Sequence, residues 1–231
     1  MSIAQNIAEI QENIRKAAIR SGRDPGEITL IAVTKTHPVE AMQEAIDAGI
    51  PDIGENKAQE VVRKHPLLER EARWHFIGHL QKNKVKYVIG RTALIHSVES
   101  MSLAREISRR AKKEGIVMPV LVEVNVSGEE SKFGLSPDQV EVFLEEAGQL
   151  MGIRVDGLMT MAPDSEDPET ARPVFRQLRQ LRDELRSRGY RLDILSMGMT
   201  NDYTVAVEEG STHVRVGTAI FGHRDYSKKE E

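Results

Sequence analysis

The chain has 231 residues, and its 32 lysines and arginines against 36 aspartates and glutamates give a formal net charge of −4 at pH 7. Both signs of charge are interspersed, so no basic field indicates nucleic-acid binding, and the lack of cysteine excludes disulfides, thiolate metal sites and cysteine nucleophiles. No apolar run forms a signal peptide or reaches the roughly 20 residues of a membrane span, so we expect a soluble, cytoplasmic protein.

Apolar residues spaced three and four apart predict an amphipathic first helix that ends at Ser21 and Gly22. Strands and helices then alternate. Strands are predicted over 28–33, 52–56, 74–78, 93–97, 118–126, 154–159, 191–195 and 213–216. Helices are predicted over 38–48, around 61–62, and over 85–89, 100–111, 136–144, 168–188, 200–209 and 218–221.

Eight strands alternating with helices predict a single α/β domain over residues 1–222, a (β/α)8 TIM-type barrel with an extra N-terminal helix. The alternative is an open doubly wound sheet. That fold would carry a glycine-rich turn of the G-x-G-x-x-G kind after its first strand, and the sequence lacks one there. The short charged tail, 223–231, is expected to be disordered.

The first strand delivers a lysine, Lys35, at its carboxyl end within the stretch ITLIAVTKTH. Burial lowers the pKa of a lysine toward the neutral amine, which can attack a carbonyl carbon. Lys35 is therefore a candidate nucleophile. The alternative is an ordinary lysine whose stem packs against the strand while its ammonium group reaches water.

Two glycine-containing turns follow the seventh and eighth strands, where barrels commonly bind phosphate. The first is Ser196-Met197-Gly198-Met199-Thr200 and the second is Arg215-Val216-Gly217-Thr218. Glycine lets backbone amides approach an anion, hydroxyl groups donate hydrogen bonds, and a helix begins nearby. Each turn alone is also typical of a simple capped strand-to-helix connection. Their occurrence together indicates a phosphate site.

Other polar or sulfur-bearing residues end the remaining strands. They are Asn56, His79, Ser97, Asn125, Ser127, Met159 and Thr160. His75 and His79 are four residues apart, but WHFIGH is predicted as strand and turn, so this spacing does not place both on one helix face and we expect no metal.

Several long segments closely resemble the pyridoxal phosphate homeostasis proteins, a family similar to the barrel domain of alanine racemase. These segments are AVTKTHP, DIGENKAQE, WHFIGHLQKNK, LVEVNVSGEESKFGL, GLMTMAP, LSMGMTNDY and VRVGTAIFG. The resemblance implies that Lys35 carries pyridoxal 5'-phosphate as a Schiff base and that Arg215 faces its pyridine nitrogen. It also implies a phosphate site formed by Ser196, Gly198, Gly217 and Thr218, with main-chain contributions from Met197 and Met199, and a cofactor lining of Asn56, His79, Ser97 and Met159.

Two positions depart from the family pattern. Some relatives have a second lysine where this chain has His37, and many have Ser-Asp or Ser-Ala where it has Thr200-Asn201-Asp202. The first departure argues against a lysine relay through residue 37. Lys132 does match a lysine of the family and is the candidate for a second, looser cofactor site, with an ordinary loop lysine as the alternative.

The resemblance implies a protein of intracellular pyridoxal phosphate homeostasis, which stores or delivers the cofactor, transiently contacts apo-enzymes and balances vitamin B6 and amino-acid pools. The alternatives are an amino-acid racemase and an aldolase-type sugar-phosphate enzyme. An arginine at the pyridine nitrogen opposes the ring protonation that makes the cofactor an electron sink. Racemisation also requires a base on each face of the α-carbon, and Tyr87, Tyr190, Tyr203 and Tyr226 are not clearly placed as the second base. We therefore expect a carrier without turnover, and a monomer because no apolar stripe is left exposed.

Overall fold

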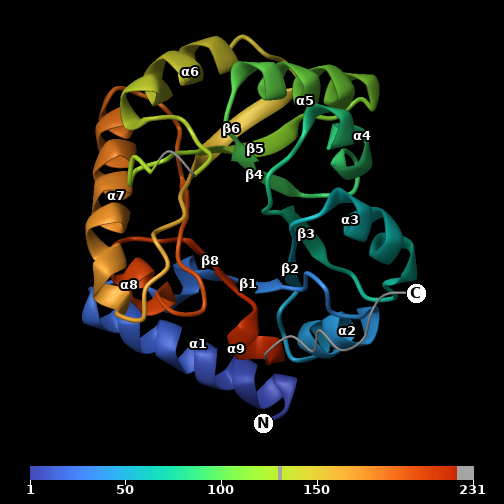
Figure 1. The fold of residues 1–231 in the computed structure, drawn as a ribbon, viewed down its shortest axis with the longest axis vertical. Helices are drawn as coiled ribbons and strands as arrows, with labels where there is room; N and C mark the ends of the chain where they lie inside the picture. Colours follow the sequence, from blue (N-terminus) through green and yellow to red (C-terminus); the bar gives the residue numbers. More distant parts are fainter. Residues whose placement is uncertain (130–131, 223–231) are drawn as a thin grey trace.

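In the described residues, 1–129 and 132–222, the computed structural model is a closed barrel of eight parallel strands surrounded by helices (Figure 1). The strands pair in sequence order, and β8 pairs with β1 to close the barrel. The strands are β1 (Thr29–Val33), β2 (Asp52–Glu55), β3 (Arg73–Phe76), β4 (Leu94–Val98), β5 (Met118–Glu123), β6 (Ile153–Met159), β7 (Ile194–Ser196) and β8 (His213–Val216).

The α-helices of the described residues form the outer layer. They are α1 (Ile3–Arg20), α2 (Val39–Asp47), α3 (Ala58–Lys64), α4 (Val85–Val88), α5 (Met101–Lys113), α6 (Val140–Ala147), α7 (Arg172–Ser187), α8 (Tyr203–Glu208) and α9 (Thr218–Phe221). Short 3-10 turns connect several elements, over Pro25–Glu27, His65–Leu67, Lys82–Lys84, Pro137–Gln139 and Pro168–Ala171.

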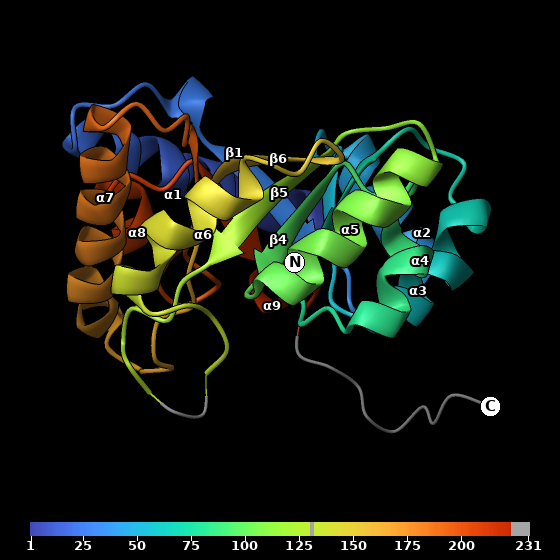
Figure 2. The same cartoon turned by 90° about the horizontal axis from the view of Figure 1, so that it is seen from above.

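The strands are buried on both faces, as their near-continuous apolar sequences require. In β1, residues Leu30 to Val33 are all buried between the barrel interior and the helices. The parallel register places Ile31 opposite Arg215 of β8 and Ala32 opposite Ile53 of β2. The carboxyl ends of all eight strands therefore meet at one mouth of the barrel, and in Figure 2 the long loop after β5 extends away from the barrel.

The N-terminal helix is an integral part of the fold. A capping box between Ser2 and Gln5 begins α1, and its buried residues Ile7, Ile10 and Ile14 pack in one core cluster with residues of β1, β8 and α8. Figure 1 shows α1 running beside α8 and α9. Helix α1 thus covers the place where the first and last strands close the barrel.

The barrel prediction is confirmed, and some boundaries differ from those predicted. The fifth strand ends at Glu123 and not at 126, because the Asn125 amide already donates to the Leu135 carbonyl of the following loop and the Leu135 amide donates to the Glu123 carbonyl. The eighth helix begins at Tyr203 and not at 200. The predicted long helix over 168–188 starts as a 3-10 turn and becomes α-helical only at Arg172. The seventh strand was predicted over 191–195 but spans Ile194–Ser196. The predicted disorder of 223–231 lies outside the described residues.

Candidate functional site at the carboxyl ends of the strands

The structure places the predicted site residues at the same end of the barrel. Lys35 follows β1 by two residues and is half-buried, and the two glycine turns follow β7 and β8, with β8 paired to β1. The remaining predicted residues lie at or just beyond the ends of β2, β3, β4 and β6, namely Asn56, His79, Ser97 and Met159. Barrel enzymes form their active sites at this end.

Lys35 lies in a tight turn with an unusual backbone. The His37 amide donates to the Thr34 carbonyl (3.0 Å), which closes a four-residue turn with Lys35 and Thr36 at its centre. Thr36 has φ of 66°, and it is the only non-glycine residue with positive φ among those described. This conformation costs an L-residue roughly 1–2 kcal/mol. The turn that presents Lys35 is therefore strained.

The two glycine turns differ in how strictly they require glycine. Gly198 has φ of 95°, and a Cβ atom there would lie 2.5 Å from the Cβ of Ala206. At Gly217 φ is −121°, and a Cβ atom would lie 3.3 Å from Val33. Only the first position excludes a side chain on both conformational and steric grounds. Beside it, the Met199 amide donates to the Asp202 carboxylate (2.6 Å), which ties this turn to the start of α8.

Arg215 is buried inside the barrel below the mouth. Its guanidinium donates to the Ser196 hydroxyl oxygen (2.6 Å) and to the Thr160 carbonyl (3.1 Å). Burial lowers the pKa of Arg215 to about 10, so it remains a cation at neutral pH. The predicted role of the Ser196 hydroxyl in phosphate binding stays a prediction, and in this structure that hydroxyl is directed into the interior.

A chain of hydrogen bonds continues from Ser196 through the barrel. His96 Nδ1 lies 2.8 Å from Ser196 Oγ, His96 Nε2 lies 3.0 Å from His75 Nδ1, and His75 Nε2 lies 2.9 Å from Asp52 Oδ1. A guanidinium can only donate, so the Ser196 oxygen accepts from Arg215. The Ser196 hydroxyl in turn donates its hydrogen bond to His96 Nδ1. Each later group then donates to the next, ending at the Asp52 carboxylate. Burial is the main cause that lowers the pKa of His96 well below its usual value, so His96 is neutral, as this chain of hydrogen bonds requires.

Two glutamates at the mouth were not predicted from the sequence. Glu123 ends β5 and is buried, and its Oε2 accepts no hydrogen bond from any described residue. Burial, reinforced by the charge of Glu99, raises its pKa to about 7. Glu99 lies 3.4 Å from His79 Nδ1. The sequence did offer a signal for Glu123, namely a carboxylate at the end of a very apolar strand. The same kind of signal, a charged residue where an apolar strand ends, identified Lys35 after β1.

The other predicted residues have varied surroundings. Asn56 Oδ1 is buried without a partner among the described residues, and Ser97 Oγ donates to the Gly78 carbonyl (2.5 Å). The ring of His79 stacks on Phe133 with centroids 4.1 Å apart. The ring of His37 packs against Phe221 of α9 in a tilted arrangement, with centroids 4.7 Å apart.

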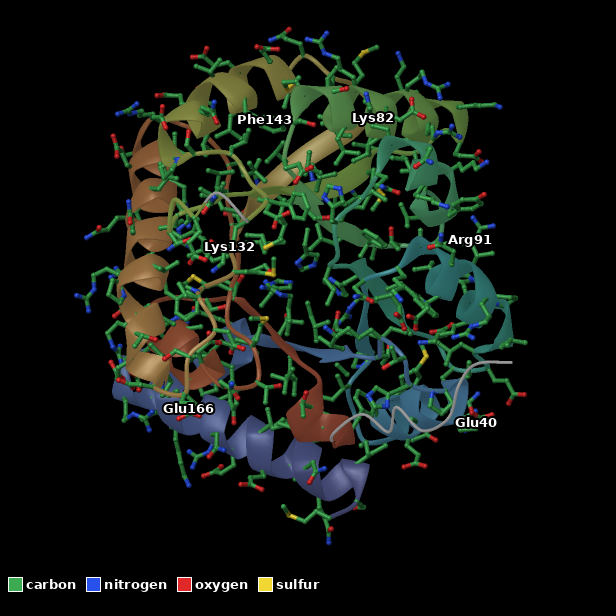
Figure 3. The ribbon with its side chains drawn as sticks, viewed as in Figure 1. Glu40, Lys82, Arg91, Lys132, Phe143 and Glu166 are labelled. Carbon is green, nitrogen blue, oxygen red and sulfur yellow. The ribbon has the colours of Figure 1, made fainter. Side chains whose placement is uncertain are left out.

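Lys132 lies in the loop after β5. Its Nζ is 3.3 Å from Glu129 Oε1 and 3.5 Å from the Met161 carbonyl. In Figure 3 its label lies between α7 and the middle of the view, and Figure 2 shows that the loop after β5 extends away from the barrel. The structure thus gives Lys132 loop partners, and its role in a second cofactor site stays a prediction.

The described tyrosines have other partners or positions than those that a second base would need. The Tyr203 hydroxyl accepts from Asn13 of α1, the ring of Tyr87 on α4 faces the ammonium groups of Lys84 and Lys86, and Tyr190 precedes β7 at the opposite end of the barrel. Tyr226 lies outside the described residues. None of the three described tyrosines ends a strand at the mouth.

Within 1–129 and 132–222, no group of three or more histidine, cysteine, aspartate or glutamate side chains could hold a metal ion. No helix in the same ranges is long and apolar enough to cross a membrane.

Comparison with known proteins identifies the family. Residues 5–225 match the family model of the alanine racemase N-terminal domain. The pyridoxal phosphate homeostasis protein of Aquifex aeolicus is 46% identical over 98% of this chain and 100% of its own length, and that of Escherichia coli is 40% identical over 98% and 99%.

Solved structures agree with this assignment. The structure of PipY from Synechococcus elongatus with pyridoxal phosphate bound has a TM-score of 0.82 at 34% identity, covering 96% of this chain and 100% of that one. Alanine racemase of Clostridium difficile has a TM-score of 0.76 at 17% identity, covering 96% of this chain and 57% of its own, which shows a shared barrel fold. The chain therefore belongs to the pyridoxal phosphate homeostasis proteins, a family built on the barrel of the alanine racemase N-terminal domain.

Proposed function

We propose that this protein binds pyridoxal 5'-phosphate covalently at Lys35 and serves in the homeostasis of that cofactor. The observation that carries the proposal is the position of Lys35, which a strained turn presents at the barrel mouth next to the glycine turns of β7 and β8. The bound cofactor in PipY, which is 34% identical to this chain, supports the choice of ligand.

The residues present fit this cofactor. Pyridoxal phosphate supplies an aldehyde that condenses with a primary amine, and Lys35 is the amine. The backbone of Gly198 and that of Gly217 and Thr218 would hold the phosphate, because glycine allows close approach to an anion. The amides of Met197 and Met199, which were also predicted to contribute, donate in this structure to the His213 carbonyl and to the Asp202 carboxylate. The Thr218 hydroxyl is exposed and can donate, whereas Ser196 would contribute through its hold on Arg215.

Arg215 would face the pyridine nitrogen, where a fixed cation opposes ring protonation. The lining would comprise Asn56, His79, Ser97 and Met159. Asn56 Oδ1, buried and without a partner among the described residues, is a free acceptor at the end of β2, the strand next to β1. Buried polar atoms are rarely left unpaired, so this atom supports a polar ligand at the mouth.

The proposed activity is binding, storage and delivery without turnover. A racemase needs a second base opposite the lysine, and Tyr87, Tyr190 and Tyr203 have other surroundings. We further propose a cytoplasmic monomer that passes its cofactor to apo-enzymes through transient contacts, with Lys132 as the candidate for a looser second site.

The first test is chemical. The purified protein should absorb near the boundary of violet and visible light, and borohydride reduction followed by peptide mapping should locate the pyridoxyl group on Lys35. Lys35→Ala should abolish both signals, whereas Lys112→Ala, on the exposed surface of α5, should retain them. Finding the reduced group on another lysine only would refute the proposal.

The second test addresses turnover. Each common amino acid is incubated with the loaded protein in deuterium oxide, and α-deuteration and product chirality are measured. Loss of a placed acid–base group costs roughly 10²–10⁴ in rate, so we expect no sustained exchange with inversion. Exchange with inversion at about 10 s⁻¹, the typical turnover of enzymes, would establish the racemase instead.

A further inference from the structure

A cluster of three charged side chains lies buried beneath the Lys35 turn. Glu55 ends β2, and Glu60 and Lys64 lie one turn apart on α3. Their exposed fractions are 0%, 7% and 2%. Lys64 Nζ donates to Glu55 Oε1 and to Glu60 Oε2, both at 2.7 Å, so one ammonium group joins the two carboxyls.

The cluster forms hydrogen bonds with the backbone on both sides of Lys35. Lys64 Nζ also donates to the Thr34 carbonyl at 2.9 Å, and Glu60 Oε2 accepts from the Thr36 amide at 2.9 Å. The two peptide groups that flank Lys35 are thus held by α3. A third contact, from the Thr34 hydroxyl to Glu55 Oε1 at 2.7 Å, ties the same turn to β2.

These contacts explain how a threonine keeps a left-handed backbone. Such a conformation persists only where the surroundings fix it, and it concentrates at functional sites. The Glu60 carboxylate orients the Thr36 amide directly, and Lys64 fixes the carbonyl that closes the turn. Without them, Thr36 would relax toward negative φ, and the direction in which Lys35 leaves the backbone would change.

Stability alone does not account for the cluster. Burying charges is costly, and well-packed apolar residues in place of a buried ion pair often leave a protein equally or more stable. The arrangement instead has a specific target, because both α3 charges meet at the backbone of one turn. Interaction with Lys64 and with the Thr36 amide lowers the pKa of Glu60 despite its burial, while burial raises the pKa of Glu55. An ionised Glu60 is therefore paired with Lys64.

We propose that Glu60 and Lys64 are positioning residues that hold the Lys35 turn in its strained form and so aim the Lys35 amine at the barrel mouth, with Glu55 supporting Lys64. The inference rests on the proposed function for the identity of the aldehyde that Lys35 captures. The effect of the turn on the Lys35 amine, however, can be measured as its rate of reaction with any small aldehyde.

The experiment measures how fast Lys35 reacts in the apo-protein. The second-order rate constant is determined for pyridoxal phosphate and for salicylaldehyde, which has no phosphate, and the modified lysine is identified by reduction and peptide mapping. Glu60→Gln and Lys64→Met should slow the reaction at Lys35 with both aldehydes about tenfold or more, since small misplacements of a reacting group cost up to 10²-fold. Lys112→Met should change neither rate, and thermal unfolding is followed in parallel.

A rescue variant separates positioning from general support of the fold. Glycine adopts positive φ without strain, so Thr36→Gly introduced into the Glu60→Gln or Lys64→Met protein should recover most of the lost rate at Lys35. Because glycine also relieves the cost of positive φ, the double variants should gain no more melting temperature than Thr36→Gly alone gives the parent. Because Glu60→Gln preserves side-chain shape, it provides the test even where Lys64→Met does not fold.

Two results would overturn the inference. One is a parental reaction rate in folded Glu60→Gln and Lys64→Met proteins. The other is a slowed rate that Thr36→Gly leaves unchanged or that returns only with the melting temperature. Failure of the proposed function looks different, because the parent would then react with salicylaldehyde at Lys35 but retain no pyridoxal phosphate there.

Discussion

The turn after β1 and the turns after β7 and β8 are built in opposite ways. The first contains a strained threonine and is held by buried charged side chains, Glu60 and Lys64. The other two depend on Gly198 and Gly217, where the main chain itself can face a ligand. A side-chain amine must point in one direction to react, whereas an anion can be bound by backbone amides that glycine leaves accessible. Substitutions that disturb the first turn should therefore change the rate at which Lys35 reacts with an aldehyde. Substitutions in the other two turns should change how tightly the cofactor is retained.

The largest expected effect on cofactor retention is at Gly198. A Cβ there would overlap Ala206 on α8, and φ of 95° disfavours any L-residue. We expect Gly198→Ala to lower the unfolding free energy by about 1–3 kcal/mol, as overpacking does, and to lower cofactor retention about tenfold or more because the turn must move. Retention is measured by dialysis of the loaded protein and stability by urea unfolding.

Gly217→Ala is the matched control for Gly198→Ala. Its Cβ would lie 3.3 Å from Val33, a tight contact but without positive φ. We expect a clearly smaller loss of both retention and stability. Equal losses at the two glycines would contradict the difference between them, and parental retention by Gly217→Val would place the phosphate elsewhere.

The next effect concerns pH and Glu123, a buried carboxyl that ends β5 and whose Oε2 accepts no hydrogen bond from the described residues. The pKa of Glu123 is raised to about 7, so the folded state holds its proton more tightly than the unfolded state does. The resulting stabilisation is present below pH 4.5 and is lost as pH rises through 7, a change of about 3 kcal/mol.

Glu123→Gln removes this titration. Compared with the parent, the variant should gain relative stability between pH 5 and pH 8, and the gain is measured by urea unfolding at both values. Glu71→Gln, at an exposed position, should show no such change. A parent and a Glu123→Gln variant with parallel pH profiles would show that Glu123 stays ionised or finds a partner in solution.

Sequence reasoning identified the residues whose position follows from strand order. Lys35, Gly198 and Gly217 end apolar strands, and a barrel brings such ends together. It did not identify Glu60 and Lys64, because the backbone groups that they bind lie 24 and 30 positions earlier in the chain. A glutamate and a lysine four apart on a helix are also usually a surface pair. The direction of the Ser196 hydroxyl could not be predicted from the sequence either. Whether the Ser196 side chain faces an anion or Arg215 depends on its rotamer in the folded barrel.

The smallest expected effect compares two hydroxyls in the proposed phosphate site. Thr218 is exposed at the start of α9, so Thr218→Ala removes one hydrogen bond donor to an anion, which is worth about 1 kcal/mol or roughly fivefold in retention. Ser196 is buried and bonded to Arg215 and His96, so Ser196→Ala leaves the guanidinium and the imidazole without their shared partner. Its main effect should therefore be on the absorption of the bound cofactor and on stability. Dissociation rates and spectra of both variants distinguish these outcomes. If Ser196→Ala only weakened phosphate retention and left spectrum and stability unchanged, its hydroxyl would have to turn from Arg215 to the anion when the cofactor binds, and the main chain would share the phosphate with two side chains.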